Sequence, residues 1–457
     1  MTAYRRNRDS ATEPRTERLE DPRLAERARC HVTRRLMPFL MLVYLLAYLD
    51  RANVGVAKLQ MQPDLGFSDS VIGFGAGIFF FGYLLLDVPG SLIVEHWSAR
   101  KWIARIMLSW GAVAVLTGFI GTYKFGGMSP EHQFYALRLM LGIAEAGFFP
   151  GVIVYLSHWF QLADRSRAKA YFMVTQPIAI ALGVPLSTLI LKKVHWLGWE
   201  GWRWVFILEG IPPVVFGVIT SWYLTDHPHQ AGWLAADEKQ WLVSTLAREQ
   251  AEKISGHRVS FIDALRYPQT LLLMASSFLV ITGNQALIFF LPSITESMKD
   301  MPVVLRNLGA ALPYACSAIG ILLNGFWAQR TGKLRYHTAI PMIATGVALG
   351  LAVLAEGHGW VAMSLFCCAG LTAQAYLPTL WTFPTAILGK SAAAAAVGII
   401  CVSNLGGFVG PYLFGYLRTT TGSFRAGLEA AALCMLTSGV IALQVRLPHP
   451  VLTGIVE

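Results

Sequence analysis

The chain of 457 residues is 54% hydrophobic and only 14% charged, with a formal net charge of +10. A soluble protein of this length needs more charge to cover its surface, whereas apolar windows of about 20 residues, each long enough to cross a bilayer, recur here. The composition predicts an all-α membrane protein, and because no base-reading motif accompanies the basic excess, no nucleic-acid partner is expected.

The predicted elements begin with a polar, arginine-rich tail over residues 1–33. Twelve apolar segments follow, and we expect each to be a transmembrane helix: 34–57, 71–94, 101–122, 133–160, 167–191, 202–224, 269–294, 305–328, 337–355, 360–388, 392–417 and 424–445. Together they predict one bundle over 34–224 and a second over 269–446, with a short tail over 447–457.

The polar connection between the sixth and seventh segments, residues 225–268, separates the two bundles. Its apolar residues Leu234, Trp241, Leu242 and Leu246 recur at helical spacing between charged residues. This pattern predicts an amphipathic helix that lies on the inner face of the membrane.

Lys and Arg gather in the tail 1–33, in the connection 225–268 and in the other loops on the same side. Because basic residues concentrate in cytoplasmic loops, both termini are predicted to be cytoplasmic, and Lys58 is expected in an outer loop. We expect a monomeric, multi-pass protein of the cell inner (plasma) membrane, with the lipid bilayer as its surroundings.

The two halves show weak internal similarity. The loop "SLIVEHWSARK" after the second segment corresponds to "GFWAQRTGK" after the eighth, and "GVP" in the fifth segment corresponds to "GP" in the eleventh. Similar motifs at the same place in each half indicate two parallel repeats related by an axis along the membrane normal.

Five stretches carry a resemblance to a known family: "YLDRANVG", "FFFGYLLLDVPG", "LRLMLGIAEAGFFPGVIVYLSHWF", "GWRWVFILEGIPP" and "DHPHQAGWLAADEKQWL". Through them the chain resembles the major facilitator superfamily over about 34–447, and within it the anion:cation symporter family of bacterial tartrate, galactonate and phthalate permeases. The resemblance implies the major facilitator fold, with 12 transmembrane helices in two six-helix pseudo-repeats.

The superfamily's inner loop motif, G-x-x-x-D-R-x-G-R-K, is altered in both halves. Glu95 takes the aspartate position in the first copy, and Gln329 takes it in the second. The resemblance therefore implies an inner gate in the first half, where Asp87 and Glu95 are expected to bind loop arginines such as Arg100.

Four ionisable residues lie inside predicted spans: Asp50 and Arg51 in the first, and Arg138 and Glu145 in the fourth. Each such charge costs about 2.5–3.5 kcal/mol at the centre of a membrane helix. Asp50 and Arg138 are predicted at similar depth, and Arg138 and Glu145 share one helix face. The residues alone leave two interpretations, a structural set of ion pairs or a path for solute and protons.

The resemblance implies roles for these four residues. Asp50 and Glu145 match proton-binding carboxylates, Arg51 matches the anchor of the substrate carboxylate, and Arg138 matches the partner of Asp50. A guanidinium binds a carboxylate bidentately, so we expect an organic anion to supply the countercharge that Arg51 otherwise lacks.

Other residues are candidates for the substrate cavity. The hydroxyl groups of Tyr48 and Tyr83 can donate to substrate oxygens, and Gln176, Trp381 and Asn404 match cavity-lining positions of the family. Ordinary packing remains the alternative for these last three. Glu209, in the sixth span, is expected to have a structural role, paired with an arginine.

The sequence thus predicts a proton-coupled symporter for a small organic anion. A sugar acid or hydroxy-dicarboxylate such as tartrate is the first choice of substrate, and an aromatic carboxylate of the phthalate or hydroxyphenylacetate type is the second. A proton-independent facilitator or exchanger and a transporter-like anion sensor remain alternatives. The polar loops are too short for a catalytic domain and the chain lacks P-loop, GxSxG and HExxH motifs, so no enzyme, cofactor or metal site is expected.

Overall fold

The computed structural model describes residues 22–122, 127–253, 267–383 and 402–446, and within this part every regular element is a helix. The side chains of a few helical residues, Asp87 and Glu95 among them, lie outside the described part. Nine of the described helices or helix pairs are long and apolar enough to cross a membrane.

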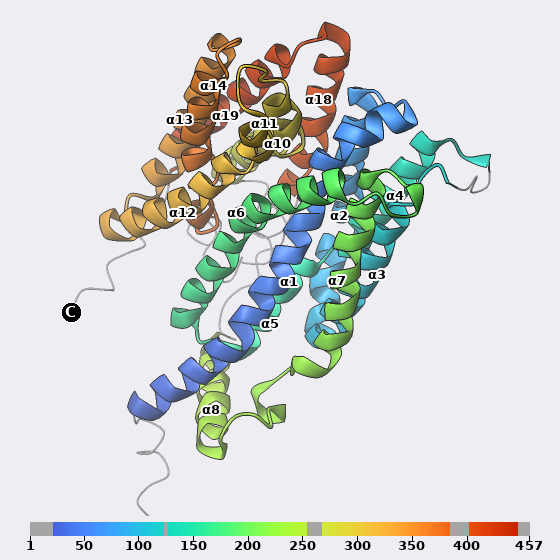
Figure 1. Cartoon of the computed structure of the whole chain (residues 1–457). Helices are drawn as coiled ribbons and strands as arrows, with labels where there is room; N and C mark the ends of the chain where they lie inside the picture. Colours follow the sequence, from blue (N-terminus) through green and yellow to red (C-terminus); the bar gives the residue numbers. More distant parts are fainter. Residues whose placement is uncertain (1–21, 123–126, 254–266, 384–401, 447–457) are drawn as a thin grey trace, which may run out of the picture.

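The helices of the first half pack into one bundle, coloured blue to green in Figure 1. They are α1 (Pro22–Leu65), α2 (Asp69–His96), α3 (Ala99–Thr117), α4 (Pro130–Glu145), α5 (Phe148–Trp159), α6 (Leu162–Lys193) and α7 (Gly201–Tyr223), with a 3-10 turn η3 at Trp196–Gly198. Ser98 caps α3 through the backbone N–H of Lys101, and Ser129 caps α4 immediately before Pro130.

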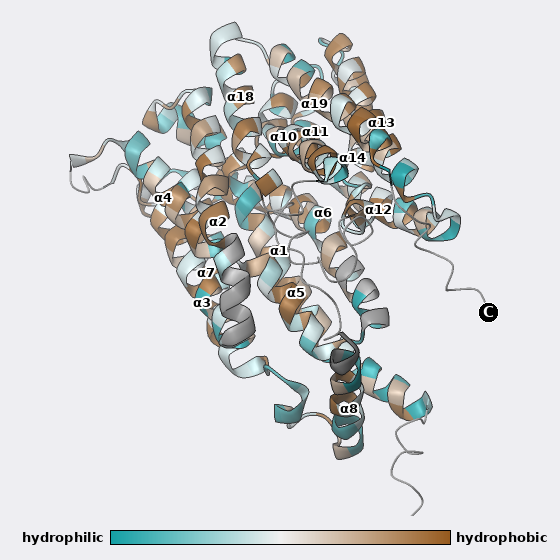
Figure 2. Ribbon diagram, turned by 180° about the vertical axis from the view of Figure 1, so that it is seen from behind, coloured by the Kyte–Doolittle hydropathy of each residue, from teal (hydrophilic) through white to brown (hydrophobic). Residues whose placement is uncertain are grey.

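The helices of the second half form a separate bundle, coloured yellow to red. They are α10 (Pro268–Glu296), α11 (Val303–Gly309), α12 (Leu312–Thr331), α13 (Leu334–Leu354), α14 (Gly359–Ala373), α15 (Leu377–Leu380), α18 (Gly406–Thr421) and α19 (Arg425–Gln444). Hydrophobic residues run along the long helices of both bundles, while hydrophilic residues gather at their ends (Figure 2).

Several expected spans are longer or more broken than predicted, the first and the fourth among them. The first helix was predicted over 34–57, but α1 extends from Pro22 to Leu65. It therefore includes Lys58, so the expected position of Lys58 in a loop is wrong. The fourth span is interrupted between α4 and α5, where Gly147 has a φ of +78°. The membrane therefore contains a helix end next to Glu145, the last residue of α4.

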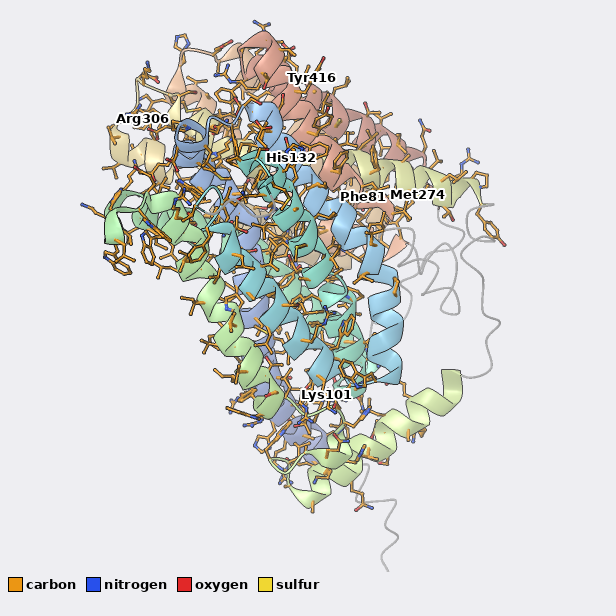
Figure 3. All side chains as sticks on the ribbon, turned by 90° about the vertical axis from the view of Figure 1, so that its right-hand side faces the viewer. Phe81, Lys101, His132, Met274, Arg306 and Tyr416 are labelled. Carbon is orange, nitrogen blue, oxygen red and sulfur yellow. The ribbon has the colours of Figure 1, made fainter. Side chains whose placement is uncertain are left out.

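Large apolar side chains cover the outside of the bundles. Phe81 and Tyr416 project from the outer faces of α2 and α18 (Figure 3), and both are exposed in the isolated chain. Soluble proteins rarely leave large contiguous apolar surfaces exposed to water, so this outer surface is consistent with contact with lipid.

The connection between the bundles contains η4 (Pro228–Gln230) and the helix α8 (Ala236–Lys253), which lies beyond one end of the first bundle (Figure 1). Trp241 and Leu242 are buried in the protein core, which differs from the expected position of this face against the membrane. Glu238 receives hydrogen bonds from Arg27 Nε at 2.7 Å and from His31 Nδ1 at 2.9 Å. The helix is therefore docked on the extension of α1.

The two bundles meet closely at the end where α1 finishes and α2 begins. A side chain on Gly73 of α2 would collide with the backbone carbonyl of Pro411 in α18. Ser70 donates hydrogen bonds from its backbone N and its Oγ to Thr419 Oγ1, at 3.0 and 2.9 Å. This end of the bundle interface is closed.

Candidate functional site

The four charged residues, two on α1 and two on α4, come together beside the close contact between α4 and α2. Gly142 of α4 has no side chain, and a Cβ there would collide with the carbonyl of Phe79 in α2. This close approach sets the Phe79 ring beside both arginines, with the guanidinium carbons of Arg51 and Arg138 at 5.3 and 5.0 Å from its centroid.

Arg51 forms an ion pair with Glu145: its Nη2 lies 2.6 Å from Glu145 Oε1. The expectation that Arg51 lacks a countercharge in the absence of substrate is therefore wrong. The contact is poorly aligned for hydrogen bonding, since neither oxygen of Glu145 nor Arg51 Nε has a hydrogen-bond partner. A carboxylate ligand with better geometry can compete for the same guanidinium.

Aromatic rings surround the Arg51 guanidinium. Besides Phe79, the rings of Tyr48 and Tyr83 lie 4.9 and 5.1 Å from its central carbon. The Arg51 side chain keeps 15% of its surface exposed, while Glu145 has none. Arg51 is thus the accessible member of the pair, and both tyrosines named from the sequence lie next to it.

Asp50, the neighbour of Arg51 in α1, is almost completely buried. Its Oδ1 accepts a hydrogen bond from Asn53 Nδ2 at 3.1 Å, and its Oδ2 has no partner. Arg138 acts on Asp50 electrostatically, but the two form no ion pair within 4.0 Å. Instead Arg138 Nε donates to the carbonyl of Gly75 at 3.4 Å.

Several polar atoms of this buried group remain without hydrogen bonds: Asp50 Oδ2, Arg51 Nε, Asn53 Oδ1, Arg138 Nη2 and both oxygens of Glu145. Buried polar groups in folded proteins are nearly always paired, so a cluster of unsatisfied atoms marks a place for water, a proton or a ligand. The arrangement can rearrange its ion pairs at small structural cost.

Of the remaining cavity candidates, Trp381 is the one whose contact joins the two bundles. Trp381 follows α15 and packs on Phe149 of α5, with ring centroids 5.2 Å apart. Gln176 in α6 and Asn404 before α18 are both partly buried. Tyr376 of the second bundle, which sequence reasoning missed, interacts with Tyr48 and so lies near the Arg51 site.

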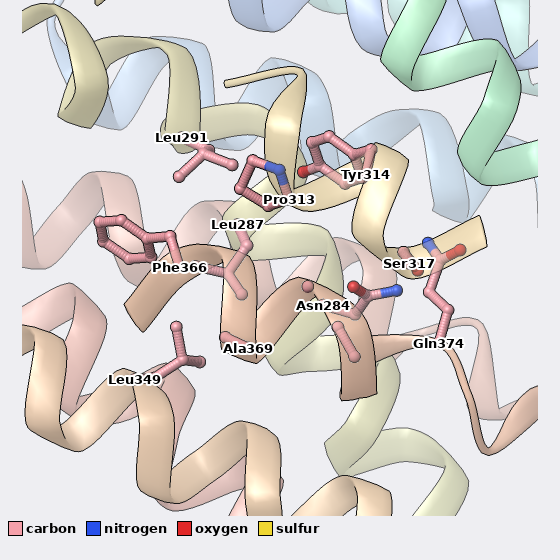
Figure 4. A pocket seen from close by; sticks show the side chains of 12 residues that line it. Asn284, Leu287, Leu291, Pro313, Tyr314, Ser317, Leu349, Phe366, Ala369 and Gln374 are labelled. Carbon is pink, nitrogen blue, oxygen red and sulfur yellow. The ribbon is translucent and has the colours of Figure 1, made fainter. Parts of the chain in front are cut away.

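The second bundle contains a small cavity of its own, between α10, α12, α13 and α14 (Figure 4). Asn284, Ser317 and Gln374 lie together at one end of it, and Leu291, Leu349 and Phe366 line the other. Its volume of ≈ 20 Å³ is about what one water molecule needs. Ser317 Oγ, Tyr314 Oη and both amide atoms of Gln374 have no hydrogen-bond partner.

The expected inner gate is only partly described, because the side chains of Asp87 and Glu95 lie outside the described residues. Arg100 contacts Asp226 instead: its backbone N donates to Oδ1 at 2.9 Å, and its Nε lies 4.0 Å from Oδ2. Ser98 Oγ also donates to Asp226 Oδ2 at 2.7 Å. Asp226, which opens the motif "DHPHQAGW" after α7, is thus an acid at this end of the bundle that sequence reasoning missed.

A second charged cluster, the Asp69 cluster, consists of Asp69, Lys58 and Arg418 and lies at the closed end of the interface. Asp69 Oδ1 is 4.0 Å from Lys58 Nζ, and its Oδ2 is 3.9 Å from Arg418 Nε. Lys58 is fully buried, with its Nζ 3.6 Å from the ring centroid of Phe290 in α10. Since Arg418 and Phe290 belong to the second bundle, this cluster joins the two halves.

Simple spacing could have identified two of the missed residues. Asn53 stands three residues after Asp50, and Lys58 stands seven after Arg51, so each lies on the same helix face as its predecessor. Glu209, by contrast, has no cation within 4.0 Å in the described residues, and the expected arginine pair is wrong. Its carboxylate accepts a hydrogen bond from Ser187.

Comparison with solved structures gives the same fold. A bacterial homolog of the human lysosomal transporter Spinster aligns over 92% of this chain and 95% of its own, with a TM-score of 0.69 at 16% identity. The xylose transporter XylE of E. coli aligns over 90% of this chain and 95% of its own, with a TM-score of 0.69 at 14% identity.

Sequence relatives are closer. A protein of Agrobacterium vitis named "Putative tartrate transporter" is 39% identical over 90% of this chain and 93% of its own length. The inner membrane transport protein RhmT of Escherichia coli is 34% identical over 91% of this chain and 95% of its own. The family model described as the Major Facilitator Superfamily matches residues 40–411. With its two helical bundles and its charged interior, the chain belongs to the Major Facilitator Superfamily and is a multi-pass membrane transporter, not an enzyme.

Proposed function

We propose that the protein is a proton-coupled symporter that imports a small organic anion across the cell inner membrane by alternating access. The observation that carries this proposal is the ion pair of Arg51 with Glu145, beside Asp50, in a site where only Arg51 is accessible. The Arg51 guanidinium can then bind either the carboxylate of Glu145 or the carboxylate of the substrate.

The coupling follows from this competition. When an anion binds Arg51, Glu145 loses the ion-pair partner that it has among the described residues, and the weaker influence of Arg138 alone then offsets its buried charge. Such a group is costly unless it takes up a proton. Anion binding at Arg51 and protonation of Glu145 therefore favour one another, and departure of the anion reverses both.

Asp50 and Arg138 supply the second step of the proposal. Asp50 takes up a proton from the outer side, which weakens its electrostatic interaction with Arg138 and permits closure around the anion. With both termini in the cytoplasm, the closed end formed by the Asp69 cluster is the outer gate. The contact between Arg100 and Asp226 belongs to the inner gate, together with Asp87 and Glu95.

The substrate proposed first is a sugar acid or hydroxy-dicarboxylate such as tartrate. A relative 39% identical to this chain is named for tartrate transport, which supports this class. Tyr48, Tyr83, Gln176, Trp381 and Asn404 are proposed to bind its hydroxyl groups or to wall the cavity. The rings of Tyr48, Phe79 and Tyr83 around Arg51 favour an aromatic carboxylate as the second candidate.

Uptake into proteoliposomes tests the proposal. The purified protein is expected to accumulate labelled tartrate when the lumen is alkaline and the outside acidic, and to lose accumulation when the gradient is collapsed. Glu145→Gln is expected to retain exchange of internal for external anion and to lose gradient-driven accumulation. Uphill uptake that survives in Glu145→Gln, or uptake indifferent to the gradient in the wild type, contradicts proton symport and leaves a facilitator or exchanger.

The same assay run with a sugar acid, tartrate and an aromatic carboxylate ranks the substrate classes. Binding of an anion with no movement across the membrane in any gradient identifies a sensor instead. Glu429→Gln is the control for loss of an acid, because Glu429 is exposed and pairs with Arg425 within α19, far from Arg51.

A further inference from the structure

Glu209 is a third acid buried in the first bundle, and neither coupling step uses it. It lies in α7 with 3% of its surface exposed. Ser187 Oγ of α6 donates a hydrogen bond to Glu209 Oε1 at 2.6 Å, while Glu209 Oε2 has no partner. The carboxyl group is thus half satisfied in an otherwise apolar contact between three helices.

The balance of charge around Glu209 leaves it without a cation. Arg51 and Arg138 face Asp50 and Glu145, so these two positive charges balance those two acids. Among the charged groups on the elements packed against it, Asp50 of α1 is the one that acts on Glu209 electrostatically, and it is also negative. An ionised Glu209 would be a buried, unpaired charge next to a like charge, which is strongly unfavourable.

Asn53 connects Glu209 to Asp50. Its amide Nδ2 donates to Asp50 Oδ1 at 3.1 Å, and its side chain is close enough to influence Glu209, although no hydrogen bond joins the two as they stand. Asn53 Oδ1 has no hydrogen-bond partner, and neither does Glu209 Oε2. Two acceptor oxygens cannot pair, but a single proton on Glu209 Oε2 turns it into a donor and satisfies both.

We propose that Glu209 holds a proton and donates it in a hydrogen bond to Asn53 Oδ1, which makes Glu209 a third proton-binding site of this bundle, linked to Asp50 through Asn53. The Ser187 bond fits this state, because Glu209 Oε1 then acts as the carbonyl oxygen of the acid. The bonded amide is held with Nδ2 toward Asp50, so Glu209 is a positioning residue for Asp50. This protonation state does not depend on the transport mechanism proposed above.

Infrared spectroscopy of the purified protein tests the inference directly. The wild type at neutral pH is expected to show the C=O stretching band of a protonated carboxyl group, and the difference spectrum against Glu209→Gln is expected to show the loss of one such band. Glutamine retains a donor for Asn53 Oδ1, so this variant keeps the fold. A difference spectrum without the acid band, or with a carboxylate band in its place, overturns the proposal.

A second variant covers the case in which Glu209→Gln fails to fold. Ser187→Ala removes the hydrogen bond to the carbonyl oxygen, so the same band is expected to shift to higher frequency, whereas an ionised Glu209 has no such band to shift. Glu429→Gln, at an exposed acid, is expected to leave the band unchanged.

The link to Asp50 has its own readout. The pH midpoint at which the Asp50 carboxyl band appears, identified by its loss in Asp50→Asn, is expected to move in Glu209→Gln and to return toward the wild-type value in Glu209→Asp. A midpoint unchanged in Glu209→Gln refutes the link through Asn53. Because these measurements use protein without substrate, their failure is separate from any failure of proton-driven uptake.

Discussion

The two bundles share a fold but bury different kinds of polar residue. The first buries ionisable residues: Asp50, Lys58, Arg138, Glu145 and Glu209. In the described part of the second, the buried polar residues are neutral, among them Ser276, Asn284, Ser317, Gln374 and Ser438. Ser276 Oγ donates to the carbonyl of Ser438 at 3.0 Å, a bond that holds α10 and α19 together.

This difference predicts that the two bundles have different roles in transport. Charges exchange partners when an anion or a proton arrives, whereas neutral hydroxyl and amide groups change little with protonation. Energy coupling is therefore expected in the first bundle, and shape or hydroxyl recognition in the second. The most informative tests change one residue in each bundle and compare the effects on stability, anion uptake and proton coupling.

The largest effect is expected at Arg51. Arg51→Leu leaves Glu145 buried without its ion-pair partner, which should destabilise the protein by about 3–5 kcal/mol and abolish anion uptake. The double variant Arg51→Leu/Glu145→Leu removes the orphaned charge, so thermal unfolding should show recovered stability without recovered uptake. The proposed binding of the anion at Arg51 is contradicted if Arg51→Leu is as stable as the double variant. It is also contradicted if either variant takes up the anion.

The second-largest effect is expected at Asp69 of the first bundle, which lies next to Arg418 of the second bundle. Asp69→Asn leaves Lys58 and Arg418 without their ion pairs and should favour opening of this end by about 1–3 kcal/mol. A cysteine at Ile288, buried against α1, should then react faster with an impermeant maleimide by roughly 5–150-fold. Glu429→Gln, which breaks an ion pair within one helix, serves as the control and should leave labelling unchanged.

A smaller effect of opposite sign is expected in the second bundle. Gln374 is buried with both amide atoms unpaired, so Gln374→Leu should be neutral or stabilise by about 1 kcal/mol, with proton coupling retained. Asn324 is the matched amide, because its Nδ2 donates to the carbonyls of His337 and Ala375 at 2.7 Å each. Thermal unfolding should show that Asn324→Leu is less stable than Gln374→Leu. If Gln374→Leu is the less stable variant, this interpretation of the cavity is wrong.

The smallest effect concerns the docking of α8, outside the membrane. Burial alone would raise the pKa of Glu238, but hydrogen bonds from His31 and Arg27 outweigh it and hold the pKa below its usual value. The carboxylate therefore contributes stability at pH above about 4.3, its value in an unfolded chain, and this contribution is lost as the pH falls through the lowered pKa.

Amide hydrogen exchange of α8 measures this contribution. The protection factor of these amides, which corrects for the slower intrinsic exchange in acid, should fall in the wild type on acidification below about pH 4. The decrease should correspond to less than ~1 kcal/mol because Arg27 is half exposed. In Glu238→Gln exchange should be faster at neutral pH and should depend less on acid. Asp237→Asn, at an exposed neighbour, is the control with a smaller expected change.

The sequence alone determined the class and the broad plan. Apolar windows determine that helices cross a membrane, because a buried backbone in lipid must satisfy its own hydrogen bonds. Motifs such as "YLDRANVG" placed Asp50 and Arg51 inside the first span, and Arg138 and Glu145 lay on one face of the fourth. The superfamily and the charged residues of the first bundle were therefore predictable.

The partners of those charges were decided by the tertiary structure alone. Arg51 is bound by Glu145 from a different helix, and Glu209 is bound by Ser187 instead of an arginine. Lys58 is buried because the second bundle closes over it with Phe290. Helical periodicity predicts which residues share one face of a helix. Which two helix faces contact each other depends on side-chain packing between helices far apart in the sequence. An ionisable group buried at such a contact pairs with the nearest partner that this packing provides.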